Sequence, residues 1–159
     1  MAEFDRVETD LLYTEKAHFC AAEHFKLTHF VLGGSAAVAS AITAAAIWDK
    51  RTTLSAVLTL VAAMAAALLT FVKPLSVAAL HVACGRKLAD LRFRVRQSKI
   101  LDGHPDSGVS DTTLRQLVAA FTEEKHQALD DAPTTGPLSF WRAQRKIDAG
   151  HFTYPVDEA

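Results

Sequence analysis

Two cysteines and two histidines have the spacing of a metal site on paired helices. Cys20 and His24 are four residues apart, and His81 and Cys84 are three apart, so each pair would share one helix face. All four lie 26 to 34 residues from Lys50, at similar heights if the chain turns back there. Two thiolates and two imidazoles suit tetrahedral zinc. The alternative is that the spacing is generic for helices, with two small buried cysteines and two polar histidines between them.

No catalytic motif accompanies these side chains. The sequence has no glycine-rich nucleotide loop, no GxSxG, no HExxH and no CxxC. A nucleophile built on Cys20 or Cys84 with a nearby histidine is the enzymatic alternative, but burial on a helix favours an inert thiol. Two cysteines also exclude a disulfide-rich secreted scaffold. We therefore expect a protein that is not an enzyme and needs no cofactor, with zinc as an open alternative.

A basic segment lies in the middle of the chain. Its six members are Arg86, Lys87, Arg92, Arg94, Arg96 and Lys99. The simplest interpretation is a solvated helix face that contacts anionic lipid headgroups and fixes membrane topology. A docking surface for a nucleotide or a regulator is the alternative. Nucleic acid is not an expected partner, because the net charge is -1 and no pattern of aromatic side chains for base stacking accompanies these Arg and Lys residues.

Two charge-free runs must position these residues. Residues 27–48 and 52–72 contain no Asp, Glu, Lys or Arg, and only Asp49, Lys50 and Arg51 separate them. Each run can cross a hydrocarbon core of about 30 Å as a helix that rises about 1.5 Å per residue. The turn is too short for a domain, so the runs predict an antiparallel transmembrane hairpin. A soluble bundle is the alternative, but its helices would normally show a polar face.

Small residues recur at every fourth position in both runs. They are Gly33, Ala37, Ala41 and Ala45 in the first run and Ser55, Thr59, Ala63 and Ala67 in the second. Such stripes let helix backbones approach closely, either within the hairpin or between copies of the chain. A weakly polar pore lining is a further interpretation, with Ser35, Ser40, Thr43, Ser55 and Thr59 turned inward. One hairpin cannot enclose a channel, so any pore requires a homo-oligomer.

The segments outside the runs predict an all-α fold. Apolar positions alternate by threes and fours over residues 4–25 and 77–98, so both membrane helices should continue as a packed stalk, over about 4–48 and 52–101. Pro74, directly after Lys73, should kink the second helix at the membrane exit, with His81 seven residues further on. Two short helices should follow, over about 114–129 and 138–149, with an extended tail. The predicted parts are a hairpin with a stalk over 1–102 and a helical region over 103–159.

The distribution of Lys and Arg predicts the orientation. The turn holds two bases, whereas the segments that flank the other ends of the runs hold more, with Lys16 and Lys26 on one side and Lys73, Arg86 and Lys87 on the other. Bases collect on the cytoplasmic side of membrane helices. We therefore expect both termini, and the region over 103–159, to be cytoplasmic, in a multi-pass protein of the inner (plasma) membrane.

The layout resembles a known family, the SMODS- and SLOG-associating two-transmembrane effector (SLATT) domains. The resemblance lies in the helix–span–short turn–span order, in the second half "FVKPLSVAALHVACGRKLADLRFRVR", and in the close "FWRAQRKIDAGHFTYPVDE". It implies a pore-forming or membrane-disrupting effector of bacterial conflict and antiviral defence systems. It also implies a separate sensor or nucleotide-signalling partner, because no sensor domain is visible in the sequence. A non-pore, membrane-anchored protein that recruits a cytoplasmic partner is the alternative.

Overall fold

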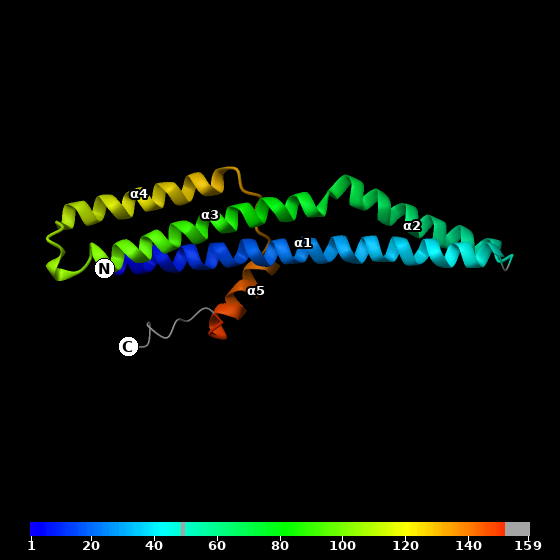
Figure 1. Cartoon of the computed structure of the whole chain (residues 1–159), viewed down its shortest axis with the longest axis horizontal. Helices are drawn as coiled ribbons and strands as arrows, with labels where there is room; N and C mark the ends of the chain where they lie inside the picture. The colour runs from blue at the N-terminus through cyan, green and yellow to red at the C-terminus, as the bar shows by residue number, and fades with distance from the viewer. Residues whose placement is uncertain (49, 152–159) are drawn as a thin grey trace. The chain divides into compact units, whose positions relative to one another are not determined.

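The computed structural model describes residues 1–48 and 50–151, apart from the side chain of Pro105. Its helices are α1 (Ala2–Trp48), α2 (Thr52–Val72), α3 (Pro74–Leu101), the short 3-10 helix η1 (Pro105–Ser107), α4 (Asp111–Asp130) and α5 (Pro137–Asp148) (Figure 1). No strand occurs over the described residues, so the prediction of an all-helical chain is confirmed. Asp49 of the charged turn and most of the tail expected to be extended lie outside the described residues.

The chain divides into two compact units. One, the bundle unit, consists of residues 1–22 and 79–159, and the other, the apolar unit, consists of residues 23–78. The bundle unit therefore joins the start of α1 to most of α3 and to α4 and α5. The apolar unit holds the rest of α1, the turn, α2 and the first residues of α3.

The core of the bundle unit is built from the predicted stripes. Phe4 and Leu11 of α1 pack with Leu88 and Val95 of α3, and Phe121 of α4 closes the cluster, all at most 5% exposed. Phe4 and Leu11 are seven residues apart, as are Leu88 and Val95, which keeps each pair on one side of its helix. In this unit, residues that precede the first charge-free run and residues that follow the second pack against each other.

A second, smaller contact holds α5 on α1. Ala143 of α5 is fully buried against Ala17 and Cys20 of α1. Small side chains on both helices allow this close approach. The Phe140 ring stacks on the Tyr13 ring, with centroids 6.2 Å apart.

The second long helix is not continuous, which corrects the prediction of a single kinked helix over about 52–101. α2 ends at Val72, and Lys73 adopts the left-handed conformation, with φ 46° and ψ 55°. The Lys73 N–H donates to the Leu69 carbonyl oxygen (3.1 Å) and closes the last turn of α2. Pro74 then starts α3, where its missing N–H and fixed φ are favourable. The proline therefore begins a new helix after a full break.

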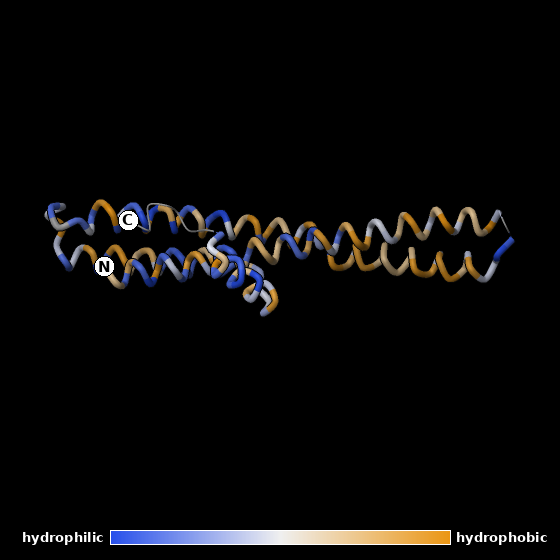
Figure 2. Tube along the Cα trace, turned by 90° about the horizontal axis from the view of Figure 1, so that it is seen from below, coloured by the Kyte–Doolittle hydropathy of each residue, from blue (hydrophilic) through white to orange (hydrophobic). Residues whose placement is uncertain are grey.

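The apolar unit buries little of its own surface. α2 lies beside the second part of α1, and most of both segments is coloured hydrophobic in Figure 2. The fully buried positions in this pair are the small residues Ala39, Ala46 and Ala65, each 5% exposed. The large apolar side chains point outward instead, including Phe30 (71% exposed), Met64 (56%) and Phe71 (84%).

Candidate functional site

Two features could carry function, one in each unit: the outward surface of the apolar unit and a buried polar cluster in the bundle unit. Two helical stretches, Ala2–Trp48 and Thr52–Leu101, are long and apolar enough to cross a membrane. Their apolar segments are only 11% and 6% buried. A core helix of a soluble protein would be mostly buried. The exposed apolar surface of these helices must therefore be covered by something other than the rest of the chain.

The contact between the two apolar helices does not use the predicted four-residue stripe of α1. Its buried residues Ala39 and Ala46 lie about 200° around the helix from Ala41, at about 100° per residue. Ala37, Ala41 and Ala45 are accordingly exposed. The small stripe of α1 therefore faces away from α2.

On α2 the stripe starts near the contact with α1, and its later members lie on the outer surface. Ser55 is half-buried, whereas Thr59, Ala63 and Ala67 are exposed. Gly33 of α1 remains near the contact, because a Cβ there would lie 3.9 Å from Leu69 Cδ1. The stripes are thus largely available to another molecule.

The hydroxyl groups of the two runs are satisfied within their own helices. Ser35, Ser40 and Thr43 each donate to a carbonyl oxygen three or four residues earlier, at 2.8 to 2.9 Å. Ser55 and Thr59 do the same at 2.8 Å. Because these bonds need no water, the side chains are compatible with lipid, with a protein contact or with a weakly polar pore wall.

The buried polar cluster consists of His18 on α1 with His81 and Cys84 on α3. The Nδ1 atoms of His18 and His81 are 3.1 Å apart, and His18 Nε2 lies 3.7 Å from Cys84 Sγ. The Cys84 thiol also lies 3.6 Å from the Ala128 carbonyl oxygen of α4. All three side chains are at most 5% exposed. The bond between the rings needs one protonated and one bare Nδ1, so it cannot persist with both imidazoles charged.

Burial keeps this cluster neutral. It lowers the pKa of His18 from 6.5 to about 4, with a further contribution from the adjacent His81. Burial also lowers the pKa of His81 and raises the pKa of the Cys84 thiol, although Lys87 opposes the latter effect. A buried thiol with a raised pKa has little thiolate, which argues against Cys84 as a nucleophile.

The four residues considered for zinc are not brought together as a set. Cys20 packs with Ala17 and Ala143, and His24 is exposed. Over residues 1–48 and 50–151, no group of three or more His, Cys, Asp or Glu side chains is placed to hold a metal ion.

The residue that sequence reasoning missed is His18. It lies within residues 4–25, the segment predicted to pack as part of the stalk, and its ring is the one that contacts His81. A usable signal was present, since His18 lies 32 residues before Lys50 and His81 lies 31 residues after it.

Three members of the predicted basic face, Arg92, Arg94 and Lys99, form ion pairs within the bundle unit. Arg92 Nε donates to Glu15 Oε2 at 2.8 Å, and the Glu15 side chain is only 3% exposed. Arg94 holds Glu124 of α4 through two bonds of 2.6 and 3.1 Å. Lys99 bridges two acids near the start of α1, Asp5 at 2.6 Å and Glu8 at 3.3 Å. Through these three bases, α3 forms ion pairs with α1 and α4. The acid partners raise the pKa of Arg94 and of Lys99.

The remaining bases of this segment differ in exposure. Arg86 and Lys87 are exposed, and Arg96 is half-buried. The surface left for a charged partner is therefore smaller than the sequence predicts.

Comparisons with protein-family models, with curated proteins and with solved structures give no match.

Proposed function

We propose that the apolar unit crosses the inner (plasma) membrane as a two-helix hairpin and that the chain acts as a homo-oligomeric, pore-forming or membrane-disrupting effector of a bacterial defence system. The observation that supports the membrane part is the outward apolar surface of α1 and α2. Leaving one large apolar side chain in water instead of burying it is unfavourable by about 1.5–3 kcal/mol. Lipid contact removes that surface from water without further folding.

The proposed orientation places both termini in the cytoplasm. The bundle unit carries the ion pairs of Arg92, Arg94 and Lys99, which suit an aqueous compartment. Lys73, Arg86 and Lys87 follow the second span, where bases favour the cytoplasmic side.

The outward stripes of small residues support self-association. Ala37, Ala41 and Ala45 face away from α2, where a second copy could approach closely. A single pair of helices cannot enclose a channel, so a pore needs several copies. The resemblance to SLATT domains supports the effector role and a separate sensor or nucleotide-signalling partner as its trigger.

A membrane-anchored interaction protein is the second candidate. The observation that favours it is that the bundle unit has a hydrophobic core of its own. Here the spans would only anchor, and the bundle unit would recruit a cytoplasmic partner.

Induced expression in a bacterial host tests the effector proposal. The full chain should be recovered in the membrane fraction and should make cells permeable to a membrane-impermeant dye. Ala41→Leu places a bulky side chain in the stripe and should abolish both crosslinked oligomers and dye entry. Ala41→Ser keeps the residue small and serves as the matched control, with both readouts retained.

Three results would reject parts of this proposal. Recovery in the soluble fraction without detergent would end the membrane assignment. Absence of dye entry, even with the cognate activator co-expressed, would end the pore assignment. Full biological activity after replacement of both spans by an unrelated two-span hairpin would favour the anchored interaction protein.

A further inference from the structure

Helix α5 uses only one narrow side to pack. Ser139 and Ala143, four residues apart, are its buried positions, and Ala143 meets Ala17 and Cys20 of α1. Phe140 flanks this contact by stacking on Tyr13 and is still 48% exposed. The rest of the helix surface therefore faces away from α1.

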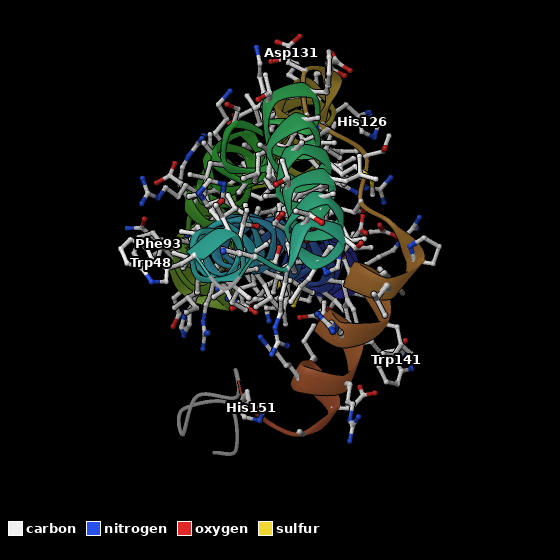
Figure 3. The ribbon with its side chains drawn as sticks, turned by 90° about the vertical axis from the view of Figure 1, so that its right-hand side faces the viewer. Trp48, Phe93, His126, Asp131, Trp141 and His151 are labelled. Carbon is white, nitrogen blue, oxygen red and sulfur yellow. The ribbon has the colours of Figure 1, made fainter. Side chains whose placement is uncertain are left out.

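The outward face of α5 combines apolar and basic side chains. Trp141 is 54% exposed and lies about 200° around the helix from Ala143. Leu138 is 50% exposed and lies on the same side. The Arg145 guanidinium is 5.7 Å from the centre of the Trp141 ring. Figure 3 shows the Trp141 ring projecting away from the α5 ribbon.

The net positive charge of α5 favours an anionic binding partner for its outward face. Arg142, Arg145 and Lys146 stand against a single acid, Asp148. Exposed Trp with neighbouring Arg is the composition of helices that lie in a membrane interface, where the indole sits at headgroup depth and guanidinium groups meet phosphates. Each base near an anionic membrane adds to binding.

The length of the connecting chain limits the distance between the attachment point of α5 and the proposed membrane surface. α5 packs on Cys20, which is seven residues before the charge-free run that starts at residue 27. Seven residues reach at most about 25 Å even when fully extended. A headgroup layer at the start of that run is therefore within reach.

We infer that the outward face of α5, formed by Leu138, Trp141, Arg142 and Arg145, binds the anionic headgroup surface of the membrane that holds the apolar unit. This inference rests on the membrane insertion proposed above. Binding there would fix α5, and with it the side of α1 that precedes the span, against the lipid surface.

The two tryptophans of the chain make the test specific, because Trp48 and Trp141 are the only ones. The full-length Trp48→Phe protein reports on α5 alone, and the Trp141→Phe protein reports on Trp48, which is 92% exposed at the end of α1. Both proteins are reconstituted in vesicles of phosphatidylcholine with or without phosphatidylglycerol. Emission wavelength and quenching by brominated lipid are then measured. Because both leaflets have the same composition, the direction of insertion does not affect the result.

We expect Trp141 emission to shift to the blue and its quenching to be at least about twofold stronger with phosphatidylglycerol than without it. Arg142→Glu should remove that gain. Arg115→Glu is the matched control, since Arg115 is an exposed arginine of α4 that lies outside this face, and it should retain the gain.

The outcomes separate this inference from the membrane assignment. Quenching of Trp48 without quenching of Trp141 would overturn the inference while the hairpin stays in the bilayer, and would point to a protein as the occupant of α5. Equal quenching of Trp141 in both kinds of vesicle would overturn the role of the bases. Absence of quenching at both tryptophans would overturn the membrane assignment together with the inference.

Discussion

Mild acid should open the bundle unit, and His18 sets the size of the effect. Burial and the neighbouring His81 hold the pKa of His18 at about 4, against 6.5 in an unfolded chain. As the pH falls below 6.5, the unfolded or open state takes up a proton that the closed state refuses until about pH 4. Stability is therefore complete above pH 6.5 and is lost progressively toward pH 4.

The magnitude follows from the two pKa values. Between pH 7.5 and pH 5, His18 alone lowers the free energy of opening by about 2 kcal/mol, because one pKa unit corresponds to about 1.4 kcal/mol. The lowered pKa of His81 acts in the same direction. Charging both rings would also end the Nδ1–Nδ1 hydrogen bond of 3.1 Å.

Backbone amide exchange of the full chain in detergent micelles measures this opening segment by segment. After correction for the intrinsic rate, amides around His18 in α1 and around His81 in α3 should exchange about thirtyfold faster at pH 5 than at pH 7.5. His18→Gln cannot take up a proton there and should lose most of this pH dependence. His126→Gln, which replaces an exposed histidine of α4, is the matched control and should keep it.

The decisive measurement is the difference between the wild type and His18→Gln in how amide exchange depends on pH. All other ionisable side chains are the same in the wild type and in His18→Gln, so their contribution to the pH dependence cancels between these two proteins. An equal dependence on pH in these two proteins would mean that His18 does not stay neutral in the closed state.

Three further predictions concern single positions. Glu15→Gln removes the acid of a buried ion pair and should destabilise the bundle unit by roughly 3 kcal/mol, whereas Glu124→Gln in an exposed pair should lower stability by less than about 1 kcal/mol in the same thermal denaturation. Equal losses would contradict the assigned burial. Gly85→Val should lower the melting temperature through about 1–3 kcal/mol of crowding, because even a Cβ there would lie 3.1 Å from the Phe19 ring; an unchanged melting temperature would show that the ring moves aside freely. Lys73→Gly should stabilise the helix break by roughly 1 kcal/mol, since glycine adopts a φ of 46° without the Cβ penalty, and a lower melting temperature would instead indicate a continuous helix.

The sequence predicted the helices and the core of the bundle unit well, because both depend on periodicity. Leu88, Leu91 and Val95, for example, follow one another at three- and four-residue spacing, and burial on one helix side follows directly. The break at Lys73 was not predicted. A proline inside an apolar run indicates a disturbance, but whether the preceding residue bends or adopts the left-handed conformation depends on local packing.

Two of the three residues of the polar cluster were predicted, and the third was missed because the direction of a side chain depends on packing. His81 and Cys84 were singled out, but the partner was sought at Cys20 and His24. A one-residue change of register rotates a helical side chain by about 100°, so residue counts give the height of a side chain and not its direction. His18 shares the height of His81 and also faces it, and only the folded bundle unit shows the second fact.

The sequence also left open which side of α1 each set of small residues faces. Spacing of exactly four residues advances about 40° beyond a full turn at each step, so a stripe such as Ala37, Ala41 and Ala45 winds around a straight helix. The helix pair of the apolar unit instead contacts through Ala39 and Ala46, which are seven residues apart and stay aligned. Two sets of small residues thus lie on different sides of α1, and only one of them is used within the chain. The unused set is what a second copy would need, because close helix packing in lipid depends on small residues at the contact.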